Sequence, residues 1–74
     1  MSLPPGSTIG ILGGGQLGRM MALAAARLGY RCHILDPHEQ PCAAEVSADF
    51  MRAAFDDEDA LRRFAEQCDV ITYE

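Results

Sequence analysis

The sequence contains no lysine, no C-x-x-C pair and no long apolar run. Its six basic residues are all arginines and stand against eleven acidic residues, which gives a net charge of −5 at pH 7. Nucleic-acid binding needs a basic stripe, and a membrane span needs about 20 consecutive apolar residues. We therefore expect neither nucleic acid nor a membrane among the partners of this protein.

The cysteines are also few and are not paired in the sequence. Cys32, Cys42 and Cys68 are odd in number, a pattern that disfavours both a disulfide framework and a zinc site. We expect reduced thiols in a cytoplasmic protein, with Cys32 and Cys68 acting as small core residues. No metal site is expected.

The length and composition indicate one small globular domain. Of the 74 residues, 49% are apolar and 23% are charged, which is typical of a folded chain with a modest core. Residues 1–7 lack the charged and apolar regions of a signal peptide and are expected to form a flexible leader. Residues 8–74 are expected to form the domain.

A glycine-rich turn between a strand and a helix is the most informative feature. Thr8–Leu12 is a short β-branched run, and helical spacing of apolar residues follows from Gln16 to Leu28. Gly13, Gly15 and Gly18 form G-x-G-x-x-G between them. The apolar residues with this spacing are Leu17, Met20, Met21, Ala24 and Leu28. Because the alanine-rich helix is apolar nearly all round, we expect it to be heavily covered.

This turn has the composition of a phosphate cradle. Glycine lets a ligand approach the backbone, and the free N–H groups of the first helical turn attract an anion. With no lysine present, a phosphate here would rely on those N–H groups and on Arg19. The alternative is a glycine turn that only packs the helix onto the strand.

Asp36 supports two interpretations. It ends the second expected strand, Arg31–Leu35, which should lie parallel to the first. It also lies 18 residues after Gly18, close to where a dinucleotide fold holds the adenosine ribose, which would indicate NAD. Alternatively, because Pro37 follows directly, Asp36 caps the next turn.

The remaining elements complete the expected sheet. Residues 38–47 read as a loop with one helical turn near residues 43–46, and residues 49–55 as a short third strand. Asp56 or Asp57 should cap a helix that carries the i,i+4 pairs Glu58–Arg62 and Asp59–Arg63. Its expected buried face comprises Ala60, Leu61, Phe64, Ala65 and Cys68.

Residues 70–73 read as a fourth strand, directly followed by Glu74. A strand order of 3-2-1-4 would place the glycine turn and Glu74 on two sides of one crevice. An uncovered fourth strand indicates the front of a larger protein or completion by another chain. His33 and His38 have no sequence partners for metal or triad chemistry, so we assign them no function.

The sequence contains the motifs GGGQLGRM, beginning at Gly13, and DVITYE, ending at Glu74. These two motifs resemble the N-terminal domain of the carboxyaminoimidazole ribonucleotide synthetase family, ATP-grasp enzymes of purine biosynthesis. The resemblance covers nearly all of residues 9–74 and implies a Rossmann-like (pre-ATP-grasp) α/β fold, an open parallel sheet of about four strands with flanking helices. The other matching positions are Asp36, Pro37, Pro41, Ala43 and Ala44.

The resemblance implies a ligase that uses ATP and bicarbonate, through carboxyphosphate, to carboxylate the amine of 5-aminoimidazole ribonucleotide. The ATP and Mg²⁺ sites would lie in ATP-grasp domains downstream, and the full-length protein would be a homodimer. This domain would hold the ribonucleotide through Gly15, Gln16, Leu17 and Glu74, the last on a ribose hydroxyl or the ring amine. By itself the chain is expected to bind no cofactor and to be catalytically inactive.

Two other hypotheses stay open at this point. The chain could be the NAD(P)-binding domain of an oxidoreductase, with Asp36 on the adenosine ribose, or a structural or regulatory module whose glycine turn binds nothing. Glu74 could likewise be an acid that merely ends a strand.

Overall fold

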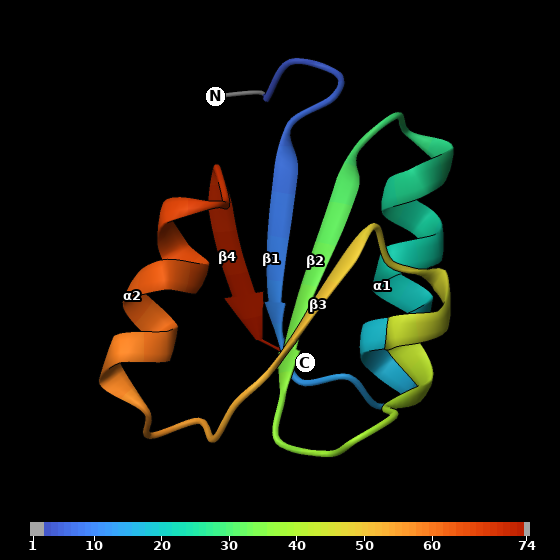
Figure 1. The fold of residues 1–74 in the computed structure, drawn as a ribbon. Helices are drawn as coiled ribbons and strands as arrows, with labels where there is room; N and C mark the ends of the chain where they lie inside the picture. Colours follow the sequence, from blue (N-terminus) through green and yellow to red (C-terminus); the bar gives the residue numbers. More distant parts are fainter. Residues whose placement is uncertain (1–2, 74) are drawn as a thin grey trace.

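The chain folds into a parallel sheet with helices on both faces (Figure 1). The computed structural model describes residues 3–73. The strands are β1 (Thr8–Leu12), β2 (Arg31–Asp36), β3 (Asp49–Arg52) and β4 (Val70–Tyr73). Their order in the sheet is β3-β2-β1-β4, the order under which the glycine turn and the end of β4 flank one crevice. The helices are α1 (Gln16–Arg27), the 3₁₀-helix η1 (Cys42–Val46) and α2 (Glu58–Glu66).

Strand β1 lies in the middle and sets the register on both sides. Gly10 pairs with His33 of β2, and Leu12 pairs with Tyr73 of β4. Because all pairs are parallel, the carboxyl ends of β1 and β4 reach the sheet edge at the same level. This edge is where doubly wound sheets bind their ligands.

One face of the sheet is covered by α1 and η1 (Figure 1). The helix approaches closely because its fully buried residues, Gly18, Ala22 and Ala25, are small, and Met21 packs partly buried beside them. The core on this face consists of Ile11, Ala22, Ala25, Cys32, Ile34 and Ala43. Small residues on the helix and branched residues on the strands therefore make the contact.

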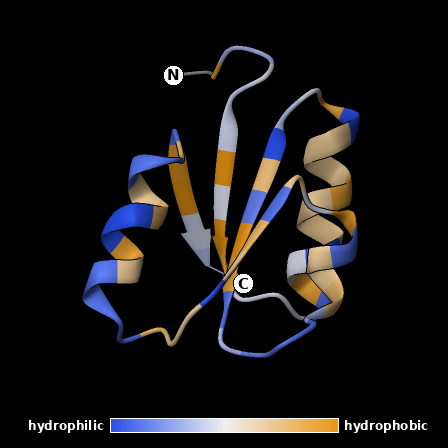
Figure 2. Ribbon diagram, viewed as in Figure 1, coloured by the Kyte–Doolittle hydropathy of each residue, from blue (hydrophilic) through white to orange (hydrophobic). Residues whose placement is uncertain are grey.

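The expectation that α1 is heavily covered is wrong: the helix buries Gly18, Ala22 and Ala25, and Met21 packs partly buried against the core. Met20 is 64% exposed, Leu28 is 70% exposed, and Leu17 and Ala24 are exposed as well. Figure 2 shows why periodicity misleads here: α1 is coloured apolar over most of its surface, while α2 is largely hydrophilic. When both sides of a helix are apolar, the spacing cannot say which one faces the sheet, and the smaller residues allow closer packing.

The opposite face is covered by α2, whose central contact is Phe64. This side chain is fully buried and lies over Gly10, with its ring centroid 4.6 Å from that of His33. Ala60 and Leu35 are buried on the same side. The expected buried face is thus confirmed at Ala60 and Phe64; Leu61 and Cys68 are half-buried, and Ala65 is exposed.

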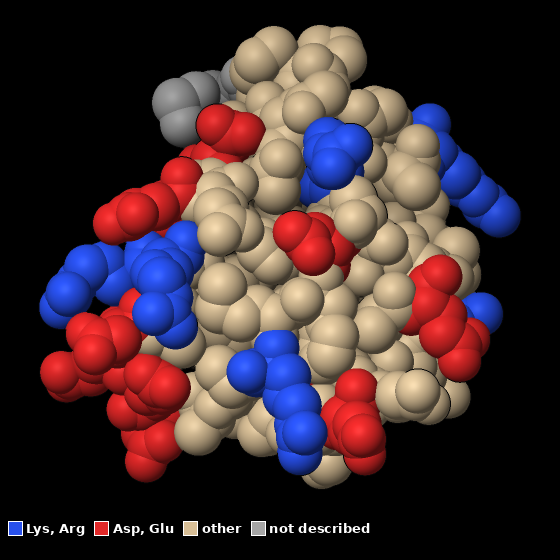
Figure 3. Space-filling view, in the orientation of Figure 1, with Lys and Arg blue, Asp and Glu red and all other residues tan. Residues whose placement is uncertain are grey.

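The start of α2 follows the capping prediction but not the predicted ion pairs. The Asp57 carboxylate accepts the Ala60 N–H at 3.0 Å. Arg62 forms an ion pair with Asp59 at 3.5 Å, an i,i+3 contact in place of the two i,i+4 pairs that were expected. Figure 3 shows acidic side chains gathered on the α2 side and arginines in separate patches.

Three further elements differ little from expectation. The helical turn before β3 is the 3₁₀-helix η1, and β3 ends at Arg52, earlier than predicted. Gly29 ends α1 with φ +86°, the left-handed conformation expected of a C-terminal glycine.

The Tyr30 hydroxyl donates to the Leu3 carbonyl at 2.8 Å, so the segment before β1 contacts the turn before β2.

The three cysteines are free, as predicted. Cys32 is buried and Cys68 is half-buried. Burial raises the pKa of both thiols, and the Asp69 carboxylate raises that of Cys68 further. Both residues therefore behave as protonated core groups rather than as nucleophiles.

Within residues 3–73, no helix combines the length and apolar character needed to cross a bilayer.

The two phenylalanines near α2 provide a test of this packing. Phe64→Ala should lower the free energy of unfolding by about 3–5 kcal/mol, because it leaves a cavity between α2 and the sheet. Phe55→Ala is the matched control, since that side chain is 50% exposed. It should cost about 1 kcal/mol or less in urea-induced unfolding. Equal losses would show that α2 does not anchor the core.

Candidate functional site: the glycine loop at the sheet edge

The glycine loop, residues 13–15, joins β1 to α1. Gly13 has φ +116°, a conformation that a residue with a side chain rarely adopts, and its N–H donates to the Leu35 carbonyl at 2.9 Å. The Gly14 N–H donates to the Asp36 carboxylate at 2.8 Å. The first two amides of the loop are therefore occupied by the end of β2.

The backbone N–H groups of the next three residues differ from these two. Within residues 3–73, the N–H groups of Gly15, Gln16 and Leu17 have no hydrogen-bond partner. They form the N-terminus of α1, which has no capping side chain and no acidic residue in its first turn. Unpaired N–H groups and the positive end of the helix dipole together favour an anion at this place.

The 3₁₀-helix η1 and the segment before it border the loop. The Ala43 N–H donates to the Gly14 carbonyl at 2.9 Å. A Cβ on Gly14 would lie 2.6 Å from Pro41 Cβ, so only glycine fits beneath this segment. The result is a hollow of about 330 Å³, lined by Gly14, Gly15, Asp36, His38, Gln40, Pro41 and Cys42.

Arg19 is directed to η1 instead of to this hollow. Its Nη1 donates to the Cys42 carbonyl at 3.1 Å and lies 3.4 Å from the Glu45 carboxylate. The guanidinium thus ties α1 to η1. The suggestion that Arg19 assists an anion is not supported by this geometry, and the open backbone N–H groups provide the donors.

Asp36 is 6% exposed and faces the loop. One carboxylate oxygen accepts from Gly14; the other accepts from the His38 N–H at 2.8 Å and lies 2.7 Å from His38 Nδ1. Burial, the largest influence, raises the pKa of this carboxyl, but the hydrogen bonds from His38 and Gly14 outweigh it and hold the pKa below its ordinary value. The carboxylate therefore stays ionised.

These contacts decide between the two interpretations of Asp36. Its oxygens are engaged by the protein's own donors, so they are not presented to the hydroxyls of an adenosine ribose. The turn-capping interpretation is confirmed, because the His38 N–H is bound two residues along the chain. The orientation of Asp36 therefore does not support NAD binding.

The second side of the crevice is formed by the end of β4. Tyr73 pairs with Leu12, the residue that precedes the glycine loop. Together with Phe55 and Leu61 these residues line an apolar hollow of about 270 Å³ on the α2 side. Glu74, the predicted carboxylate of the site, lies outside the described residues. All four residues of β4 are exposed.

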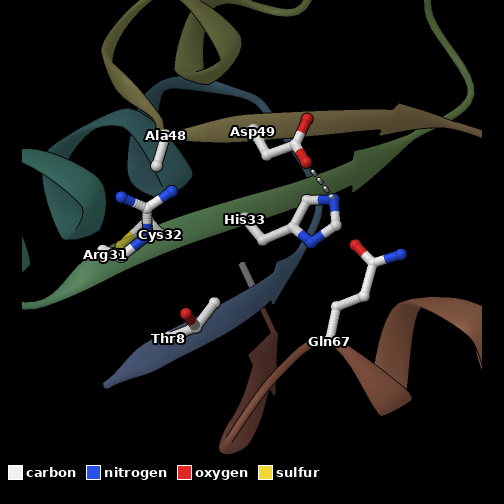
Figure 4. Close-up of a pocket in the computed structure, with 7 residues that line it drawn as sticks. All are labelled: Thr8, Arg31, Cys32, His33, Ala48, Asp49 and Gln67. Carbon is white, nitrogen blue, oxygen red and sulfur yellow. Dashed lines mark ion pairs between the residues drawn. The ribbon is translucent and has the colours of Figure 1, made fainter. Parts of the chain in front are cut away.

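A third hollow lies at the opposite, amino-terminal edge of the sheet (Figure 4). There His33 of β2 points between Asp49 of β3 and Gln67 beyond α2, with its Nε2 4.0 Å from the Asp49 carboxylate. Burial is the largest influence on the pKa of His33 and lowers it, while the Asp49 charge raises it slightly; the net shift is downward. His33 is thus a neutral core histidine.

Sequence reasoning missed the contact between Asp36 and Gly14 and the contribution of His38. The Asp-Pro-His sequence indicated a capped turn, but nothing in it showed that the same carboxylate reaches back to a residue 22 positions earlier.

Among residues 3–73, no three His, Cys, Asp or Glu side chains come together as a metal site.

The fold and the loop define the class of this protein: a doubly wound α/β domain whose first βα turn leaves three successive backbone N–H groups unpaired among residues 3–73. Residues 6–74 match the ribonucleotide synthetase preATP-grasp domain, and the chain belongs to that family.

Similar proteins are known by sequence and by structure. An N5-carboxyaminoimidazole ribonucleotide synthase of Brucella melitensis is 59% identical over 73 residues, 99% of this chain and 20% of that protein. The N5-carboxyaminoimidazole synthetase of Staphylococcus aureus, solved with ADP, is 51% identical with a TM-score of 0.95 over 97% of this chain and 19% of that one. This chain therefore spans about a fifth of the length of these relatives.

A more distant relative was solved with two ligands. The N5-carboxyaminoimidazole synthase of Aspergillus clavatus, in complex with ADP and 5-aminoimidazole ribonucleotide, is 37% identical with a TM-score of 0.79. The match covers 93% of this chain and 19% of that one.

The buried histidine gives this domain a testable pH dependence. Because the folded-state pKa of His33 lies below its ordinary value of 6.5, the stability that it supports is complete above that pH and falls as the pH drops towards the folded-state pKa. Between pH 7 and pH 5 the loss should be at most about 2 kcal/mol.

Two variants isolate this effect in urea titrations at both pH values. His33→Gln should flatten the decline, since glutamine does not titrate. Asp49→Asn should steepen it, because it removes the charge that favours protonated His33. If the unmodified protein and both variants lost the same free energy of unfolding between pH 7 and pH 5, titratable groups other than His33 would cause the loss.

Proposed function

We propose that this chain is the N-terminal, ribonucleotide-binding domain of an ATP-dependent ligase. The complete enzyme would carboxylate the amine of 5-aminoimidazole ribonucleotide with bicarbonate, through carboxyphosphate, in purine biosynthesis. Family membership and the names of the relatives support this reaction. The observation that carries the ribonucleotide-binding role is the set of open N–H groups at Gly15, Gln16 and Leu17, beside the end of β4.

The geometry suits a sugar phosphate. The phosphate would accept from the N–H groups of Gly15, Gln16 and Leu17, which the helix dipole makes favourable donors for an anion. Gly13 and Gly18 would shape the turn and the packing of α1 without contacting the ligand. Glu74, which follows the last residue of β4, would accept from a ribose hydroxyl or the ring amine across the crevice.

The other parts of the reaction would lie elsewhere in the enzyme. ATP and Mg²⁺ would bind in ATP-grasp domains outside this chain, in line with the ADP found in solved relatives. The active protein would be a cytoplasmic homodimer. Residues 8–74 alone would bind no cofactor and catalyse nothing, since the domain would supply the ribonucleotide and not the phosphoryl-transfer groups.

Removal of the Glu74 carboxylate tests the two-sided crevice. In the complete enzyme, Glu74→Ala should raise the KM for the ribonucleotide by about tenfold or more, because a charged hydrogen bond is lost. The KM for ATP should stay within about twofold. Glu66→Ala, which removes an exposed acid of α2, is the matched control and should change neither value. Equal losses of affinity for both substrates would contradict the assignment.

A side chain at Gly15 tests the amide cradle. Gly15 has φ −79° and ψ −160°, a conformation open to any residue, so Gly15→Val should fold. Its side chain should obstruct the amides and weaken ribonucleotide binding by about tenfold or more. Calorimetry with ribose 5-phosphate and with the ribonucleotide measures this, and melting temperature checks folding. Unchanged affinity would show that the loop only packs the helix.

A further inference from the structure

The bond between Asp36 and Gly14 has no place in the ligand contacts proposed above, yet it is the shortest connection between β2 and the glycine loop. We infer that Asp36 is a positioning residue for ribonucleotide binding. It holds the loop so that the next three amides point together into the crevice. This inference rests on the proposed function, because it concerns the same ligand.

The loop needs such a restraint. Residues 13–15 are three successive glycines, which lose more conformational freedom on ordering than any other residues. Gly13 is held by the Leu35 carbonyl and Gly14 by Asp36 on one side and Ala43 on the other. Gly15, where the open amides begin, follows directly. A change in the orientation of the Gly14 peptide would therefore also change the directions of the N–H groups of Gly15, Gln16 and Leu17.

A carboxylate suits this task better than an amide would. Asp36 accepts on both oxygens, from the Gly14 N–H on one and from two donors of His38 on the other. Asparagine has a single acceptor oxygen, so its NH₂ group would face either Gly14 or His38, donor against donor. With the carboxylate nearly fully buried, water cannot easily replace the missing acceptor.

The same contacts affect selectivity. Because the Asp36 oxygens are turned inward and occupied, the hollow beside the loop presents N–H donors to a ligand rather than a free carboxylate. Donors favour a phosphate, whereas a carboxylate with free oxygens would accept from ribose hydroxyls. Because the Asp36 oxygens are occupied, the backbone N–H groups are left to select the ligand, although Asp36 keeps its negative charge.

His38 provides the matched control. Its side chain is 79% exposed and contacts Asp36 but not Gly14. His38→Ala removes one partner of the carboxylate and keeps the bond to the loop, whereas Asp36→Asn disturbs the bond to the loop. If the Asp36–His38 pair only stabilised its own turn, the two variants would change the ribonucleotide KM equally.

The experiment measures both variants in the complete enzyme. For Asp36→Asn, the KM for 5-aminoimidazole ribonucleotide should rise about tenfold or more, as expected for misplaced binding groups, while the KM for ATP stays within about twofold. For His38→Ala, the ribonucleotide KM should stay within about threefold. An unchanged ribonucleotide KM in Asp36→Asn, or equal increases in the two variants, would overturn the positioning role.

Hydrogen exchange in the unmodified enzyme gives a second test that does not depend on a variant folding. The Gly14 amide should exchange slowly before any ligand is added, and the Gly15 to Leu17 amides should become protected only with ribonucleotide. Protection of Gly14 only after ligand addition would overturn the inference. An unmodified enzyme that neither binds nor carboxylates the ribonucleotide would refute the proposed function instead, and the Gly14 exchange rate would still report on the loop.

Discussion

The buried carboxylate of Asp36 joins the ends of the two central strands, and the arrangement of the glycine loop depends on it. The loop leaves β1, turns through Gly13 and is fixed to the end of β2 by its first two amides. Only after that does α1 begin. The helix N-terminus therefore lies at the sheet edge, where the N–H groups of Gly15, Gln16 and Leu17 have no partner among residues 3–73, the condition for binding an anion.

The two faces of the sheet achieve close packing by different means. On one face α1 buries the small residues Gly18, Ala22 and Ala25, and most of its large apolar side chains are exposed, Met21 excepted. On the other face α2 inserts Phe64 over Gly10 and beside His33. Small residues on α1 and one large ring on α2 therefore fill the two sides of the core.

The orientation of Asp36 distinguishes this chain from a dinucleotide-binding domain. A dinucleotide domain presents an acid at the end of its second strand to the adenosine ribose. In this chain the acid is present, but its oxygens are turned towards the protein. Similar glycine patterns can therefore serve different ligands, depending on whether this one carboxylate faces the hollow or the backbone.

The sequence by itself determined the elements, the strand order and the glycine turn, because these depend on local periodicity, on glycine and capping residues, and on the handedness of parallel crossovers. The tertiary structure decided which side of α1 is buried, which partner Arg62 takes and where Asp36 points. The buried side of α1 and the direction of Asp36 depend on residues that are distant in sequence, and Arg62 chooses between two acids, Glu58 and Asp59, at neighbouring helical spacings. Local patterns do not contain that information, since only the packed sheet brings residue 14 next to residue 36.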